Sequence, residues 1–283
     1  MAAVSAQKPT TTTRPLEIRR PRFDWSGAPR HWLGGRPGLT HFFNALHLLF
    51  PPAERWFVKT ALRALPEIND ALAAAVRGFV GQEGSHAGAH QAYLAVLETQ
   101  GFRVEPLRRR VEALFDQAGQ GPEWLQRSII AGAEQHTASL ARWVFERPVL
   151  DGADPMMRDL LLWHAAEEIE HKSVAFDILA ATHPGHAMRL LGGLIATIEL
   201  TRLWLVLAWS LIGQDPLTTK RTALRDLGRA FFEGRLPFGV IFRSALRYAW
   251  PGFHPEQEDH GDHAASYLAE SPAVAAARTG RAR

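Results

Sequence analysis

The stretch that decides the fold is WHAAEEIEH, residues 163–171. It contains a Glu-x-x-His motif from Glu168 to His171, and the same motif runs from Glu83 to His86. On an α-helix, a step of three residues places two side chains one turn apart on the same face. A carboxylate and an imidazole at this spacing are typical metal ligands in the core of a helical bundle. Both stretches are therefore predicted to be helices that present ligands to a shared interior.

Each motif is preceded along the chain by a lone glutamate, Glu54 before the first and Glu134 before the second. Metal-binding four-helix bundles take one glutamate from each of two helices and Glu-x-x-His from each of the other two. Between antiparallel helices whose ligands share one depth, the turn lies midway. The midpoints fall at residues 68–69 and 151, both inside stretches with turn signals. Four carboxylates would neutralise two divalent ions, so we predict a dinuclear site.

Two further histidines share these helix faces. His164 lies four residues before Glu168, and we expect it to be a seventh metal ligand. His90 lies four residues after His86, and we expect it to orient a ligand or line the pocket. It is also our candidate for a catalytic acid or base.

Other carboxylates and histidines near the motifs are weaker candidates. Glu167 and Glu170 flank Glu168, but only Glu168 is spaced correctly from both His164 and His171. His47 lies on the first predicted helix, and His136 is expected to point away from the ligands because it is only two residues from Glu134.

Beyond residue 38 the apolar residues recur at helical spacing, and strand signals are nearly absent. Leu-Pro, Gly and Asp-Pro punctuation divides this part of the chain into helices. Pro51 and Pro52 are expected to break the first of them, so that Glu54 begins a new segment. We predict an all-α bundle with additional C-terminal helices, its helices spanning 38–64, 69–99, 104–117, 122–146, 155–182, 186–213, 217–232 and 235–248.

The net charge of +3 belongs to the first residues rather than to the body of the chain. Residues 1–22 contain five cations and one anion, so the remainder carries 3 − 4 = −1. We predict a disordered basic arm over 1–22, a helical domain with the two metals over 23–250, and a flexible tail over 251–283. No basic face with interleaved aromatic residues indicates nucleic-acid binding, and no signal peptide is recognisable, so a cytoplasmic location is predicted.

Two compositional features limit the chemistry. The chain has no cysteine, which excludes thiolate catalysis and leaves histidine and carboxylate as metal ligands. The segment 189–213 is apolar on nearly all sides, although Glu199 and Arg202 lie near its middle. We interpret it as a helix buried in the bundle or a lid over the site, and leave open a peripheral contact with membrane or lipid.

The order of glutamates and Glu-x-x-His motifs resembles that of the ferritin-like di-iron carboxylate superfamily. With His164 added, it looks like the arylamine N-oxygenase branch, which has an extra histidine ligand. The closest resemblance, over about residues 20–250, is to a bacterial family described as predicted metal-dependent hydrolases. The motifs that carry it are FFNAL (42–46), LFPPAER (49–55), GQEGSHA (81–87) and the stretch from Trp163 to Lys172.

The resemblance implies a ferritin-like bundle with two iron ions, manganese or zinc being alternatives, held by Glu54, Glu83, His86, Glu134, His164, Glu168 and His171. The leading functional hypothesis is a non-haem di-iron oxygenase that activates O₂ to oxidise an apolar small molecule or lipid-like substrate. The first alternative is a hydrolase that uses a hydroxide bridging the metals, and the second is a metal-storage or ferroxidase protein. A homodimer is left open.

Overall fold

Helices predominate in the part of the chain that the computed structural model describes, which is residues 16–259, 262–271 and 274–275. The described residues contain no β-strand, only an isolated bridge between Leu33 and Ala153. The all-α prediction is confirmed. The α-helices are α1 (Pro37–Ala64), α2 (Asp70–Thr99), α3 (Val104–Ala118), α4 (Glu123–Glu146), α5 (Pro155–His171), α6 (Val174–Thr182), α7 (His186–Gln214), α8 (Lys220–Phe232), α9 (Phe238–Tyr248) and α10 (His263–Glu270); the 3₁₀ turns are η1 (Leu65–Glu67) and η2 (Pro255–Gln257).

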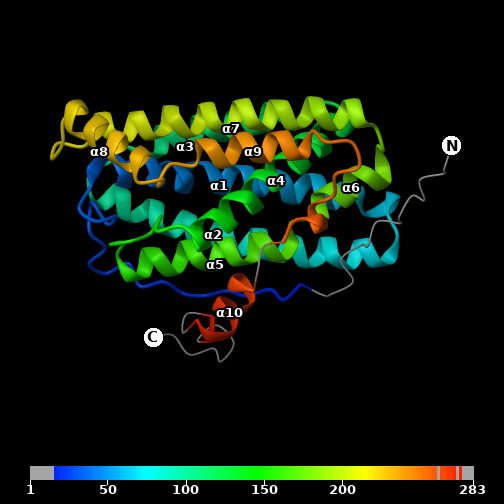
Figure 1. The fold of residues 1–283 in the computed structure, drawn as a ribbon, viewed down its shortest axis with the longest axis horizontal. Helices are drawn as coiled ribbons and strands as arrows, with labels where there is room; N and C mark the ends of the chain where they lie inside the picture. The colour runs from blue at the N-terminus through cyan, green and yellow to red at the C-terminus, as the bar shows by residue number, and fades with distance from the viewer. Residues whose placement is uncertain (1–15, 260–261, 272–273, 276–283) are drawn as a thin grey trace.

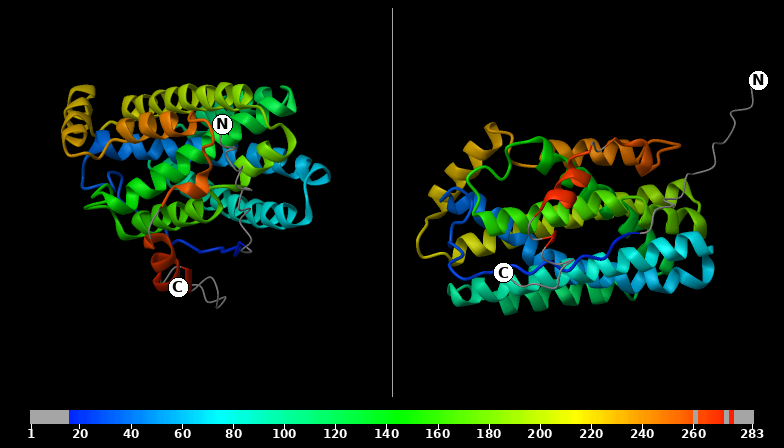
Figure 2. Two further views of the ribbon diagram at one scale, coloured as in Figure 1. Left: turned by 45° about the vertical axis from the view of Figure 1, so that its right-hand side comes forward. Right: turned by 90° about the horizontal axis from the view of Figure 1, so that it is seen from below.

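Figures 1 and 2 show these helices stacked in layers, with α1 and α4 in the middle. Helices α2, α5 and α6 pack on one side of that middle layer. Helix α7 packs along α1 and α4 on the other side, where α9 lies beside it and α8 covers one end. The middle layer of α1 and α4 is therefore covered on one side by α2 and α5 and on the other side by α7.

Helix α1 runs without interruption through Pro51 and Pro52, so the predicted break before Glu54 is wrong. The two prolines cannot donate the backbone hydrogen bonds that the helix would make there, but their fixed φ suits a helical backbone. Nearly every residue from Gly38 to Glu54 is buried against neighbouring helices. This packing on all sides holds the helix together across the missing bonds, and Glu54 lies in its interior.

The helix predicted over 155–182 is divided in two just after His171. Lys172 and Ser173 keep backbone angles in the right-handed helical region, so the chain bends here rather than forming a loop. The two halves share α4 and α2 as neighbours, but α5 also packs on α10, whereas α6 also packs on α1. The bend lets each half follow its own neighbours.

The two ends of the described chain are better ordered than the sequence suggested. Of the predicted arm, residues 1–15 lie outside the described residues, but Arg19 is buried against α5. Of the predicted tail, residues 263–270 form α10, whose Ala264 and Leu268 pack with Leu160 and Trp163 of α5. Apolar contacts and one buried cation thus tie both segments to the helix that carries half of the motif residues.

Glycines bring α4 and α7 into close contact. A Cβ on Gly132 would lie 2.6 Å from the Cα of Gly193, and a Cβ on Gly192 would overlap Ser128. The Ser128 hydroxyl donates a hydrogen bond of 2.5 Å to the carbonyl of Met188 across the same interface. The backbones of α4 and α7 can approach this closely only because no side chain separates them.

We predict that Gly192→Ala lowers the free energy of unfolding by about 1–3 kcal/mol, because the new methyl group must push α7 away from α4. Gly213→Ala is the matched control on the same helix, where a Cβ would meet no atom within 4 Å. It should leave stability unchanged or raise it slightly, since alanine favours the helix. Chemical denaturation followed by circular dichroism measures both, and equal stabilities would contradict the close-packing argument.

Candidate metal centre

The seven residues predicted as metal ligands come together inside the bundle, at the level where α1, α2, α4 and α5 face one another. None of these residues is more than 4% exposed. Whether they bind metal remains a prediction, but their convergence from four helices is a property of the fold. Helix by helix, they are Glu54 on α1, Glu83 and His86 on α2, Glu134 on α4, and His164, Glu168 and His171 on α5.

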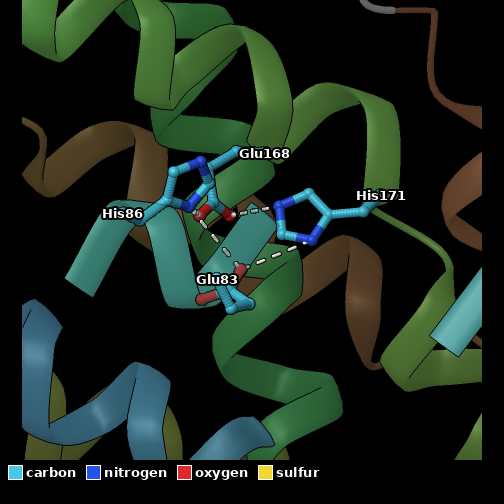
Figure 3. Close-up of side chains that lie close together, drawn as sticks. All are labelled: Glu83, His86, Glu168 and His171. Carbon is cyan, nitrogen blue, oxygen red and sulfur yellow. Dashed lines mark ion pairs between the residues drawn. The ribbon is translucent and has the colours of Figure 1, made fainter. Parts of the chain in front are cut away.

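Four of these side chains form the centre of the cluster (Figure 3). His171 Nδ1 lies 3.4 Å from Glu83 Oε1, and His171 Nε2 lies 3.6 Å from Glu168 Oε2. His86 Nδ1 lies 3.9 Å from Oε1 of both glutamates. Ligands about 2.1 Å from one cation lie roughly 3.0–3.5 Å apart. The four residues thus leave space of about the size that an ion requires.

A second, overlapping group lies next to the first. Glu54, His86 and His164 offer ligand atoms within 4.8 Å of one another. His164 Nε2 lies 3.7 Å from Glu54 Oε1 and 2.7 Å from Glu168 Oε1. The last predicted ligand, Glu134, approaches the first group, with Oε2 3.8 Å from His171 Nδ1. The two groups share His86, so two ions would be close neighbours.

The electrostatics of the cluster favour a cation. Burial, together with repulsion from the other carboxylates, raises the pKa of Glu54, Glu83 and Glu134 well above the ordinary value. Burial would also raise the pKa of Glu168, but the imidazoles of His171 and His164 outweigh this effect and hold its pKa low. Carboxylates this close and this well buried cannot all ionise without positive charge between them.

Unsatisfied polar atoms point to the same conclusion. Buried polar atoms normally have hydrogen-bond partners, and exceptions need an explanation. Among the described residues, twenty buried side-chain nitrogen or oxygen atoms have no such partner, and ten of them belong to the predicted ligands. Metal coordination would account for nine of the ten, because the imidazole of His171 can bind an ion of this cluster through only one of its two nitrogens. The ten are both carboxylate oxygens of Glu54, Glu83 and Glu134, Glu168 Oε2, His86 Nδ1 and both ring nitrogens of His171.

A chain of hydrogen bonds behind His86 was missed by the sequence analysis. His86 Nε2 lies 2.9 Å from Glu167 Oε2, and the other oxygen of Glu167 accepts a bond of 3.0 Å from Arg19. A carboxylate behind a histidine fixes the ring orientation, which here leaves Nδ1 facing the cluster. Arg19 also pairs with Glu170 at 2.6 Å. Glu167 was weighed only as a rival ligand, and Arg19 was assigned to the arm.

A line of three imidazoles leads away from the other side of the cluster. His164 Nδ1 lies 2.6 Å from His90 Nε2, and His90 Nδ1 lies 2.7 Å from His47 Nδ1. All three rings are buried, which lowers the pKa of each and keeps it neutral. His90 therefore contacts a predicted ligand without facing the cluster itself, as expected for a residue that orients a ligand.

Two other histidine positions have structural explanations. His136 points away from the cluster, as expected, and its ring nitrogens lie 2.7 Å from Thr197 Oγ1 and 3.0 Å from Ser244 Oγ. A separate group of His31, His41 and Asp215 lies close enough to hold an ion. There, however, Asp215 Oδ2 already bonds both imidazoles, at 2.6 Å and 2.8 Å, and the neighbouring cation of Arg30 would repel a metal.

An apolar cavity adjoins the cluster. Its wall is almost entirely aromatic and aliphatic, and the polar exceptions include His164 and Glu168. Two of the predicted ligands therefore line an apolar space of about 60 Å³. Among the residues that line it are Phe43, Phe50, Leu161 and Trp204.

Comparison with known proteins gives one family. The family model described as "Predicted metal-dependent hydrolase" matches residues 17–259. This range contains every residue of the cluster and Arg19 behind it. No significant match was found among curated proteins or among solved structures.

We predict that the metal-free protein loses stability as the pH rises above 6.5, whereas the metal-loaded protein does not. The raised pKa values of Glu54, Glu83 and Glu134 mean that their protonated forms stabilise the fold, so stability falls as the pH passes from their unfolded value of 4.5 through the folded one. Burial lowers the pKa of His86 and His164 below the ordinary 6.5, so these histidines reduce stability only as the pH falls below 6.5. Above pH 6.5, of these groups, only the glutamates change the stability of the metal-free protein. The melting temperature, measured as a function of pH with and without chelator, tests this difference. Glu54→Gln should make the melting temperature of the metal-free protein less dependent on pH. The same pH dependence in the loaded and the metal-free protein would contradict the argument.

We also predict that Glu167→Ala weakens metal binding by about 10- to 100-fold, because His86 loses the acceptor that orients it. Glu167→Gln should restore much of the affinity, since its amide oxygen can accept the same bond. Glu170→Ala is the matched control, because it also removes a partner of Arg19 but does not contact His86. Competition with a chelator measures affinity, and equal losses in the two alanine variants would exclude the orienting role.

Proposed function

This chain belongs to the family of predicted metal-dependent hydrolases, and on that premise we propose that it hydrolyses an apolar small molecule at the seven-residue cluster. The observation that carries the proposal is the set of ten unsatisfied buried ligand atoms next to an apolar cavity. A buried group of this kind is costly unless it binds cations, and the cavity gives a substrate access to it.

The residues present fit two divalent ions. Glu83, His86, Glu168 and His171 would hold one, with Glu134 close by. Glu54 and His164 would hold the other, beside Glu168, whose Oε1 lies 2.7 Å from His164 Nε2. Carboxylate and imidazole ligands suit zinc, manganese and iron alike. Bound divalent ions would supply Lewis acidity and a hydroxide nucleophile near neutral pH.

The chain's own contribution begins with the line of imidazoles. If His164 Nε2 is a ligand, its Nδ1–H donates to His90 Nε2, and His90 Nδ1–H then donates to His47 Nδ1. This assignment satisfies every nitrogen in the line except His47 Nε2. His90 would thus hold His164 in the ligating tautomer.

The cavity determines what can be bound. Most of the cavity wall offers no charged group to a substrate, so a polar or ionic compound would lose its hydration there without compensation. This part of the wall includes Phe43, Phe50, Leu161 and Trp204. An apolar group can instead bury its surface there and exclude water from the site. The reacting bond of such a substrate would then lie toward His164 and Glu168.

A di-iron oxygenase is the second candidate, because the composition of the cluster is compatible with iron as well as with the other metals. Four carboxylates and three imidazoles are a ligand set that iron takes readily, and an apolar cavity equally suits an oxidisable substrate. Metal storage without an organic substrate would leave the cavity without a role.

We predict that protein loaded with Zn²⁺ or Mn²⁺ hydrolyses an apolar ester such as p-nitrophenyl hexanoate without O₂. Glu83→Gln should abolish the activity together with metal binding, whereas Glu98→Gln, an exposed position on the same helix, should leave both unchanged. His90→Ala should weaken metal binding by about 10- to 100-fold and lower the activity with it, because His164 loses the acceptor that orients it.

Release of p-nitrophenolate and metal content measure these variants. Failure to hydrolyse with any metal, combined with O₂ consumption by the Fe(II)-loaded protein and oxidation of an apolar compound, would favour the oxygenase instead. O₂ consumption with no organic product would favour storage.

A further inference from the structure

Exposed apolar side chains are concentrated in one part of the molecule. Of the nineteen exposed large hydrophobic residues in the described chain, sixteen lie between Met188 and Trp250, on α7, α8, α9 and their connections. We call the exposed residues of 188–250 the outer face. Phe232 is 89% exposed, Trp250 72% and Phe242 64%. Single exposed apolar residues are ordinary, but a gathering of this size marks an interaction site.

The outer face is arranged by helical periodicity. On α9 and just beyond it, Phe242, Leu246 and Trp250 follow one another at steps of four. A stripe on α7 runs outward in the same way, while the opposite side of α7 packs on α1 and α4. Figures 1 and 2 show α7 and α9 side by side as an outer layer, with α8 at one end. The exposed stripe residues of α7 are Leu191, Leu194, Ile198, Leu205 and Trp209.

The outer face is also cationic. It contains seven exposed cations and two exposed anions. Both anions and two of the seven cations are in ion pairs, which are Glu199 with Arg202, Glu233 with Arg36, and Arg247 with Glu258. On α8 the cations alternate with apolar residues that are themselves exposed. The seven are Arg202, Lys220, Arg221, Arg225, Arg229, Arg243 and Arg247.

Apolar side chains flanked by cations match a surface that is both apolar and anionic. We propose that the outer face docks on an anionic lipid bilayer, with α7, α8 and α9 lying in its interface. Apolar residues of an interfacial helix enter the acyl boundary while lysine and arginine contact anionic headgroups. Paired symmetrically with a second copy, the same face would bring like charges together. This inference does not depend on which reaction the cluster performs.

The contacts of α7 favour docking over spanning. By length and composition α7 is the one helix in the described chain that could cross a membrane. Its inner side, however, is joined to the bundle along its length, and the buried Arg189 donates to the carbonyls of Trp250 and Phe253. A spanning α7 would have to give up these contacts and place the Glu199–Arg202 pair in the hydrocarbon.

The test is sedimentation of the full-length protein with vesicles of phosphatidylcholine alone or mixed equally with phosphatidylserine. The mixed vesicles should bind the protein, and salt should weaken the binding. Combined Phe232→Ser, Phe242→Ser and Trp250→Ser should lower the affinity at least tenfold. Combined Arg221→Glu, Arg225→Glu and Arg229→Glu should lower it by roughly 100-fold, since each basic residue near such a surface contributes about a fivefold factor.

The matched control is Leu62→Ser with Leu114→Ser, which removes two exposed leucines from outside the outer face and should leave binding unchanged. Circular dichroism shows that each variant is folded. Absence of binding to the mixed vesicles, or equal binding by the serine triple variant, would overturn the proposal. So would a stable dimer in solution that this variant dissociates, because the face would then be covered by a second copy.

Discussion

Repulsion among four buried carboxylates is the constraint on which the rest of this structure depends. Glu54, Glu83, Glu134 and Glu168 each come from a different helix, so the four helices cannot pack without bringing negative charge together. The free energy of that arrangement is acceptable only if cations lie between the carboxylates or protons neutralise some of them. The imidazoles, and the residues behind them, make sense as a frame that keeps these glutamates in place for an ion.

Much of the fold and of the cluster follows from spacing. The Glu-x-x-His spacing places both side chains on one face of a helix, whatever the neighbouring helices are. The turn lies midway between two ligands because both helices must have the same length from the ligand to the turn. Those features are local, which is why the all-α fold and the helices that carry the seven residues could be predicted from the sequence. The bend after His171 could not, because Lys172 and Ser173 keep helical angles and only the different neighbours of α5 and α6 distinguish them.

The errors concern interactions between segments far apart in the chain. Pro51 and Pro52 would end an isolated helix, but α1 is surrounded on all sides and continues. Arg19 looks like part of a basic arm until Glu167 and Glu170 are seen to enclose it. A signal was available in the second case: Glu167 lies four residues before His171, yet it was considered only as a ligand. The cationic outer face was equally hidden, since residues 189–213 are apolar on nearly all sides and six of its seven cations belong to α8 and α9.

Trp204 connects the interior of the molecule to its surface. Its ring stacks on Phe42 with centroids 4.6 Å apart, its Nε1–H donates to the Phe42 carbonyl at 2.6 Å, and it forms part of the cavity wall. The next residue along the chain, Leu205, is exposed on the opposite side of the same helix. Helix α7 thus belongs both to the wall of the cavity and to the outer face. Any displacement of this helix would act on the two surfaces together.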